Sequence, residues 1–219
     1  FLYIGCLTGR VSESSEPQPD EKRDGVPSRR VFPILLVTMF LGGFIFHTTQ
    51  VSLPKLFEQR NDGLVGDGAF GVGVLIALVY GMAGLMQVIG GHLADRFSLK
   101  KVYVAAIASQ IPVLWGASQL LGVPLVVIAT MMVMANASAL PAENLLLAFH
   151  TPAHRHGFVF GLKFVLSFGA APLAVQFVSF FTRNTEQLSF VYSVLAVVAM
   201  SALVLACILP RNRKSVSVI

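Results

Sequence analysis

Apolar residues run along this chain in long stretches without charged side chains. Five such stretches contain no Asp, Glu, Lys or Arg: 31–54, 68–94, 102–142, 164–182 and 187–210. A helix needs roughly 20 apolar residues to cross a bilayer core of about 30 Å, and each stretch is about that long or longer. None shows the strict alternation of a half-buried strand. Because a bilayer accepts only helices and closed barrels, the pattern predicts an all-α membrane protein.

The third stretch is too long for one transmembrane helix. At 1.5 Å per residue, residues 102–142 would form about 61 Å of helix, twice the thickness of the bilayer core. Gly122 and Pro124 offer a break, because proline cannot continue the backbone hydrogen-bond ladder. We therefore expect six transmembrane helices, at about 31–53, 69–93, 102–121, 124–149, 158–181 and 189–209.

Composition narrows the class of protein further. The 219 residues are 55% hydrophobic and only 12% charged, whereas a soluble domain carries about 25% charged residues. This balance excludes a soluble enzyme, a nucleic-acid-binding domain and a disordered chain. Cys6 and Cys207 lie in apolar surroundings at opposite ends of the sequence, so no disulfide framework and no cysteine metal site is expected.

Residues 1–30 differ from the rest of the chain. Ten of the 27 charged residues fall between Thr8 and Arg30, which indicates a solvated linker between domains. The preceding Phe1–Leu7 is apolar but too short to span a membrane, and we expect it to be the end of an earlier helix. On this interpretation the sequence is a fragment, with a linker at 1–30, a six-helix bundle at 31–210 and a basic tail at 211–219.

Lys and Arg are distributed asymmetrically between the predicted loops. With both termini inside the cell, twelve of the 16 fall in cytoplasmic segments and three, Lys55, Arg60 and Arg183, fall in outer loops. The last, Lys163, lies within the fifth predicted helix. Positive residues accumulate on the cytoplasmic side of multi-pass proteins, so the termini are expected in the cytoplasm of a bacterial inner membrane or a plasma membrane.

The loop between the second and third predicted helices carries a distinctive set of residues. Gly90 and Gly91 let helix backbones approach closely. Asp95 lies at the cytoplasmic end of a helix, where it can accept hydrogen bonds from a neighbouring helix N-terminus. Lys100 and Lys101 begin the next helix. An ordinary basic inner loop would explain the charges equally well.

The spacing in this loop resembles the signature Gly-x-x-x-Asp-Arg-x-Gly-Arg-Lys of the major facilitator superfamily. Gly91, Asp95, Arg96 and Lys100 match it, while positions 98–99 carry Ser and Leu in place of Gly and Arg. In that superfamily the signature lies between the second and third helices of each six-helix half. The charged linker before the six helices resembles the connection between the two halves, and identifies this chain with the C-terminal half.

The resemblance implies secondary active transport of a small solute by alternating access, coupled to an ion, most simply a proton. It implies a conformational latch formed by Asp95 and Arg96, with Gly91, Lys100 and Lys101 in the same loop. The expected partners are the lipid bilayer, the N-terminal six-helix half, a small-molecule substrate and a proton. No nucleic acid, cofactor or resident metal is expected, and the protein is not expected to be an enzyme.

Two ionisable residues lie within predicted spans, where such residues are candidates for function. Glu143 lies near the inner end of the fourth span and Lys163 near the inner end of the fifth. Each is roughly 8–9 Å deep on consecutive antiparallel helices, so an ion pair is plausible. A structural pair, a role in proton or substrate coupling, and snorkelling of Lys163 to the interface remain alternatives.

Uncharged polar residues within the spans are candidates for a substrate or proton cavity. His47 and Gln50 interrupt the first span; histidine can carry a proton near neutral pH and Gln can bind a polar solute. Tyr80 and Asn136 lie within the second and fourth spans. All four could equally supply hydrogen bonds between helices, and the sequence does not give the rotation of these helices.

Other classes of six-helix membrane protein lack their signatures here. No Gly-x-Ser-Gly nucleophile, repeated carrier motif, paired Asn-Pro-Ala boxes or Walker loop occurs in the sequence,. His150 and His154 have the spacing of a metal pair, but Pro152 between them disfavours a regular helix. The remaining alternative to a transporter is a transport-incompetent membrane scaffold that binds a partner protein.

Overall fold

The computed structural model describes residues 31–60, 69–184 and 188–209. These residues form six α-helices and one short 3₁₀ helix: α1 Val31–Arg60, α2 Ala69–Arg96, α3 Leu99–Gln119, α4 Gly122–Phe149, η1 Ala153–Arg155, α5 His156–Asn184 and α6 Leu188–Ile208. The prediction of an all-α fold is confirmed. The expected linker at 1–30 and the basic tail at 211–219 lie outside the described residues.

Five of the six α-helices are long and apolar enough to cross a membrane: α1, α2, α4, α5 and α6. This property indicates a multi-pass membrane protein. The third predicted span is a helix, α3, but it is not among these five. Its first turn contains Lys100 and Lys101, and it carries Gln110 in its middle and Gln119 at its end; such residues lower its mean hydropathy.

Some helices extend beyond the predicted spans, because the spans were bounded by charged residues and a helix can continue past them. The first span was expected to end at residue 53, before Lys55, but α1 continues through Pro54 to Arg60. Charged side chains end an apolar segment without ending a helix. The predicted break near Gly122 is present, because α3 ends at Gln119 and Gly122 has the left-handed φ of 63°.

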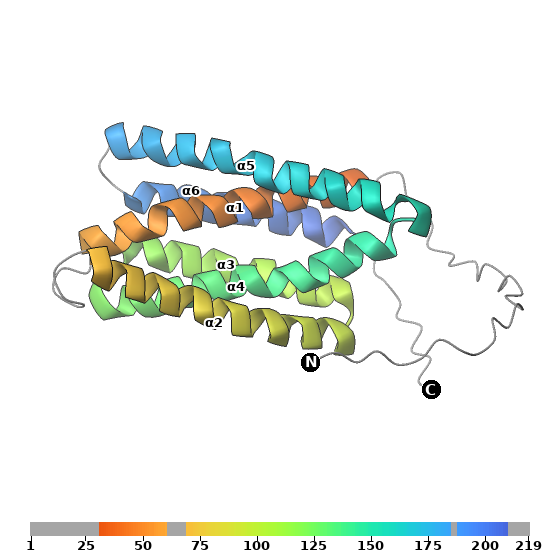
Figure 1. Ribbon diagram of the computed structural model, residues 1–219, viewed down its shortest axis with the longest axis horizontal. Helices are drawn as coiled ribbons and strands as arrows, with labels where there is room; N and C mark the ends of the chain where they lie inside the picture. The colour runs from red at the N-terminus through yellow and green to blue at the C-terminus, as the bar shows by residue number, and fades with distance from the viewer. Residues whose placement is uncertain (1–30, 61–68, 185–187, 210–219) are drawn as a thin grey trace, which may run out of the picture.

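The six helices lie side by side as an antiparallel bundle, and consecutive helices alternate in direction (Figure 1). The main helix contacts run in the order α5–α1–α6–α3–α4–α2, with further contacts of α1 to α4 and α2. We call the end of the bundle where α2 ends and α3 begins the Asp95 end. The opposite end, where α1 ends, is the Arg60 end.

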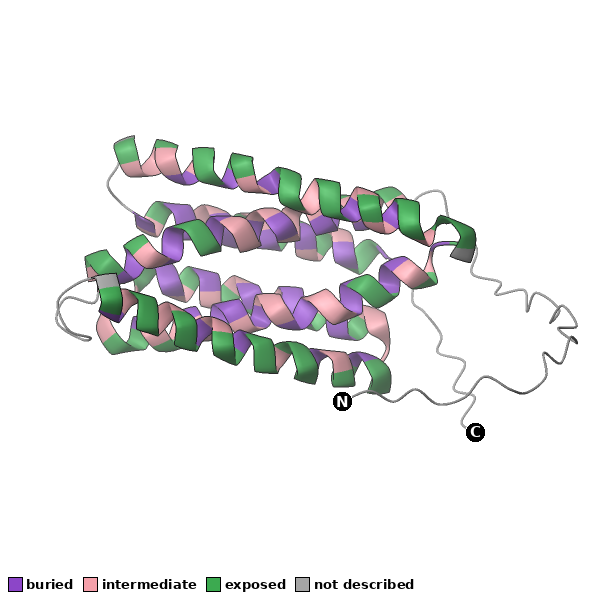
Figure 2. Cartoon of the chain, in the orientation of Figure 1, coloured by how far each residue is buried: buried purple, intermediate pink, exposed green. Residues whose placement is uncertain are grey.

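The two helices at the ends of this contact order expose most of their surface. Figure 2 shows green, exposed positions along the outer faces of α2 and α5. Large apolar side chains occupy many of them, including Leu78, Leu85 and Val88 on α2 and Phe158 and Val165 on α5. Such continuous apolar surface is expected to contact lipid or another membrane segment rather than water.

Small residues bring two pairs of helices into close backbone contact. A Cβ atom added to Gly90 of α2 would lie 2.8 Å from the carbonyl oxygen of Ser138 in α4. A Cβ atom added to Gly43 of α1 would lie 3.1 Å from the Cα atom of Ser167 in α5. The expectation that Gly90 permits close approach is confirmed. These contacts define two tight pairs, α2 with α4 and α1 with α5.

A cation stabilises a helix C-terminus at each end of the bundle. At the Arg60 end, the Arg60 guanidinium donates to the carbonyl oxygens of Ala117, Ser118 and Leu120, at 3.1–3.2 Å, where α3 ends. It also donates to Ser189 Oγ in α6. Because the last carbonyls of a helix lack partners within it and carry partial negative charge, a cation there is favourable.

At the Asp95 end, Lys100 performs the same task for α6. Its Nζ atom donates to the carbonyl oxygen of Cys207, at 2.7 Å, and to that of Leu209. A lysine in the first turn of a helix is unfavourable for that helix's own dipole. Here the ammonium group reaches the C-terminal carbonyls of the neighbouring helix, which offsets that cost and ties α3 to α6.

Candidate functional site

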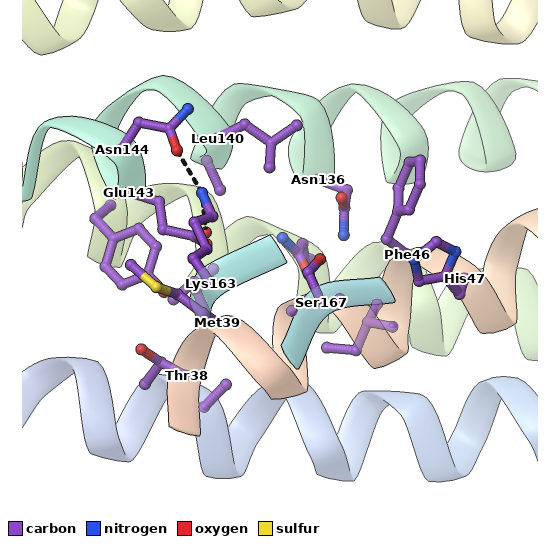
Figure 3. Close-up of a pocket in the computed structure, with 18 of the residues that line it drawn as sticks. Thr38, Met39, Phe46, His47, Asn136, Leu140, Glu143, Asn144, Lys163 and Ser167 are labelled. Carbon is purple, nitrogen blue, oxygen red and sulfur yellow. Dashed lines mark hydrogen bonds and ion pairs between the residues drawn. The ribbon is translucent and has the colours of Figure 1, made fainter. Parts of the chain in front are cut away.

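The bundle encloses a cavity of about 260 Å³, and all six α-helices contribute to its wall. Figure 3 shows Thr38, Met39, Phe46 and His47 of α1 facing residues of α4 and α5 across this space. The polar or ionisable side chains that line it are Thr38, His47, Gln87, Tyr103, Gln110, Asn136, Glu143, Asn144, Lys163 and Ser167. A polar cavity inside an otherwise apolar bundle is the candidate binding site.

Glu143 and Lys163 form an ion pair in the wall of this cavity. Lys163 Nζ in α5 lies 2.8 Å from Glu143 Oε1 in α4. The ammonium group also donates to Asn144 Oδ1 (Figure 3). Both charged residues are buried, with 6% of Glu143 and 5% of Lys163 exposed. Each of these buried charges stabilises the other, because removing one partner would leave the remaining charge buried without an opposite charge.

Two further side chains complete the surroundings of the carboxylate. Tyr103 of α3 and Thr38 of α1 line the same cavity as Glu143, and the Tyr103 hydroxyl interacts electrostatically with the Glu143 carboxyl group. Tyr103 is 1% exposed, so this contact is held by packing on all sides. The network therefore joins α1, α3, α4 and α5 around one carboxylate.

One side of the cavity is open, between α2 and α5. Gln87 of α2 and Asn144 of α4 are exposed, as are Phe164 and Phe168 of α5, although all four line the cavity. The opposite wall contains buried residues of α1, α3 and α6, such as Met39 and Tyr103. The cavity is therefore a recess that faces the gap between the two edge helices.

The four candidate cavity residues have different positions in the structure. His47 and Asn136 line the cavity, and the His47 ring lies 6.0 Å from the ring of Phe168. Tyr80 lines a separate small void instead. Gln50 is exposed and lines none of the described cavities, so the structure does not bring it to the others. Gln50 lies one helical turn beyond Phe46 and His47 on the same face of α1, nearer the Arg60 end, where the recess no longer reaches it,.

The small void adjoins the main cavity and extends it toward the Arg60 end. It measures about 10 Å³ and shares Gln110 and Asn136 with the cavity. Thr49 and Tyr80 line it, and neither hydroxyl oxygen has a hydrogen-bond partner among the described residues. A space of this size with several polar neighbours is suited to a single water molecule.

Several cavity residues were not among the sequence candidates. These residues are Gln87, Tyr103, Gln110, Asn144 and Ser167. A helical stripe provides a signal for some of them, because Asn136, Leu140 and Glu143 follow the i, i+4, i+7 spacing of one helix face. Extending that stripe from Glu143 would have found Asn144 beside it.

The expected latch residues lie together at the Asp95 end, outside the cavity. Asp95 and Arg96 are exposed at the end of α2, and Lys101 is exposed in the first turn of α3. Lys100 is engaged with the end of α6. Gly91 packs without crowding, since an added Cβ atom would lie 4.0 Å from Pro141. The loop thus offers a cluster of exposed charges at the bundle surface.

The histidines between α4 and α5 hold the connection between these helices. His150 Nδ1 lies 2.9 Å from the Leu146 carbonyl oxygen, and His156 Nε2 lies 2.8 Å from that of Thr151. His154 is exposed. Over the described residues, no group of three or more His, Cys, Asp or Glu residues is arranged to hold a metal ion.

Comparison with known proteins adds no further identification. No model of a known protein family matches the chain, and no curated protein matches it. The cavity, its ion pair and the apolar helices around them are the features that bear on function.

Proposed function

We propose that this chain is the C-terminal six-helix half of a secondary transporter of the major facilitator type, which moves a small solute across a membrane by alternating access. The observation that carries the proposal is the polar recess with its buried Glu143–Lys163 pair inside a bundle of membrane-type helices. Intramembrane charges facing a cavity are typical of substrate and ion pathways.

The open side of the recess supports the proposal that a second, N-terminal half packs against this bundle. Half of an alternating-access transporter cannot close a pathway alone, because the substrate lies between two halves that rock against each other. The exposed faces of α2 and α5, on either side of the opening, provide a surface for the N-terminal half. In this arrangement the Asp95 end faces the cytoplasm, and the exposed Asp95 and Arg96 contact the opposite half when the inner side is closed.

Cysteine accessibility in the complete transporter tests this proposal. In a background with Cys6→Ser and Cys207→Ser, Ser167→Cys places one thiol in the recess. A membrane-impermeant maleimide should modify this thiol from either side of the membrane, because alternating access exposes the cavity to each side in turn. Val165→Cys, on the outward face of the same helix, is the matched control and should react poorly from both sides.

The alternative function, a transport-incompetent scaffold, gives a different result in the same experiment. A fixed recess would let Ser167→Cys react from one side only, whatever the solute gradient. That result would contradict the transport proposal and favour the scaffold. Modification of Val165→Cys as fast as Ser167→Cys would contradict the placement of the cavity itself.

A further inference from the structure

The charges that line the cavity cancel each other. Among the described residues that line it, Glu143 and Lys163 are the only ones with full formal charges, and they pair at 2.8 Å. Lys163 also donates to Asn144. The two charges are therefore compensated within the protein, and a solute in the recess encounters no net charge.

A solute with a net charge fits such a recess poorly. It would lose its hydration on entry without gaining a counter-ion, and the desolvation of an unpaired charge is strongly unfavourable in a medium of low dielectric constant. A fully apolar solute is also disfavoured. It would leave the carboxamides of Gln87, Gln110 and Asn136 facing it without hydrogen-bond partners,.

The remaining lining groups suit an uncharged polar solute. Each carboxamide both donates and accepts hydrogen bonds, so hydroxyl, carbonyl and amide groups of a ligand can all be matched. The aromatic rings of Phe46, Phe164 and Phe168 lie in the same wall, from α1 and α5. They provide apolar faces against which a flat or ring-shaped solute can pack.

From these observations we infer that the transported solute is an uncharged small ring compound with a hydrogen-bonding edge, of the size of a monosaccharide or a nucleobase. The volume of about 260 Å³ lies at the small end of ligand cavities,. The Glu143–Lys163 pair then acts as a charge filter, because it keeps the recess neutral. This inference rests on the proposed transport function, whose substrate class it names.

Matched solutes that differ mainly in charge test the inference. The complete protein in lipid nanodiscs is titrated with glucose, glucuronate and protonated glucosamine, with uracil and orotate, and with the zwitterion glutamine. Binding is measured as the shift in the midpoint of thermal unfolding. We expect at least one of glucose and uracil to bind, and each binding solute to exceed its charged counterparts by about tenfold or more in affinity.

Variants of the pair provide an independent measure of the filter. Glu143→Gln leaves the Lys163 charge uncompensated, so preference should shift toward glucuronate or orotate. Lys163→Gln should shift it toward protonated glucosamine. The double exchange Glu143→Lys with Lys163→Glu keeps the recess neutral and should retain the wild-type order. The wild-type titrations decide the question even where a variant does not fold.

The other outcomes overturn the inference. Tighter binding of glucuronate, orotate or glucosamine than of the uncharged solutes would show that the recess accepts net charge. Binding of glutamine alone would mean that the ion pair opens to hold a zwitterion. Binding of neither glucose nor uracil also contradicts the stated solute class. Flux of a charged solute would overturn this inference while leaving the transport proposal intact. Binding of glucose without alternating accessibility of Ser167→Cys would instead support the solute class and contradict the transport proposal.

Discussion

The Lys100 ammonium group at the start of α3 donates a hydrogen bond of 2.7 Å to the carbonyl oxygen of Cys207 at the end of α6. Lys100 was identified from the sequence as part of a possible latch, yet the structure gives it a partner within the bundle. The neighbouring Lys101 is exposed. The two adjacent lysines therefore differ in role: Lys100 links α3 to α6, whereas Lys101 lies at the surface.

This difference predicts unequal effects of two matched substitutions. Lys100→Ala should lower the free energy of unfolding by about 1 kcal/mol, because the last carbonyls of α6 lose a charged donor. Lys101→Ala should change it by less than about 0.5 kcal/mol, as is usual for surface substitutions. Denaturation in detergent micelles, followed by circular dichroism, measures both. Equal losses would contradict the assigned role of Lys100.

Adjacent glycines in α2 provide a second matched pair. Gly90→Ala should destabilise the protein by about 1–3 kcal/mol, the usual cost of overpacking, since the new methyl group would lie 2.8 Å from the Ser138 carbonyl oxygen. Gly91→Ala meets only an ordinary contact with Pro141 and should be neutral or stabilising by up to about 1 kcal/mol. The same denaturation experiment compares them, and a reversed order would show that α2 and α4 pack differently.

The buried ion pair predicts strong non-additivity. Glu143→Gln or Lys163→Gln alone should lower the free energy of unfolding by about 3–5 kcal/mol, because each leaves a buried charge without its partner. The double variant should lose much less than the sum of the two. Thermal unfolding of the four proteins in one double-mutant cycle gives the coupling energy. Additive losses would mean that the two charges do not depend on each other in the membrane.

The same pair makes a prediction for function. The charge exchange Glu143→Lys with Lys163→Glu should restore part of the transport that either single neutral variant loses. Solute flux into proteoliposomes containing the complete transporter measures this recovery. A double exchange as inactive as the single variants would show that pairing is not what transport requires of these residues.

Proton coupling is a separate hypothesis with its own test. If Glu143 or His47 carries a coupling proton, flux through the complete transporter should collapse when a protonophore dissipates the proton gradient. The gradient-driven component should also be lost in the variant of the residue responsible, Glu143→Gln or His47→Gln, while exchange of solute at equilibrium persists. Flux that does not depend on the gradient would exclude this form of coupling.

The proposed orientation can be tested by labelling exposed residues at the two ends of the bundle. In the background without native cysteines, His154→Cys lies at the Asp95 end and Glu58→Cys at the Arg60 end, and both positions are exposed. An impermeant maleimide applied outside intact cells should modify Glu58→Cys and spare His154→Cys. The reverse pattern would contradict the cytoplasmic placement of the Asp95 end.

The number and positions of the helices could be predicted because membrane helices need long uncharged stretches. Helix rise also placed Glu143 and Lys163 at similar depth, and the structure has them in contact. The rotation of each helix could not be predicted in this way. A helix such as α2 or α5 carries apolar residues on every side, because lipid and protein interior are both apolar environments. For this reason the sequence does not separate side chains that face the recess, such as Tyr103, from those that do not.

The contacts of Arg60 and Lys100 could not be predicted from the sequence, because they join segments that lie far apart along the chain. Arg60 was assigned to an outer loop from its charge, yet it lies in the last turn of α1 and binds the end of α3. Lys100 was expected in the latch loop, yet it binds the end of α6. In both cases the partner is a backbone carbonyl, which every residue possesses, so no side-chain pattern in the sequence marks the contact.

The close contacts Gly43–Ser167 and Gly90–Ser138 join four of the helices around the recess into two pairs, α1 with α5 and α2 with α4. Direct contacts between α4 and α5 are few, and the Glu143–Lys163 bond crosses that seam. The ion pair therefore joins the two helix pairs across this seam, and a separation of α4 from α5 would have to break it.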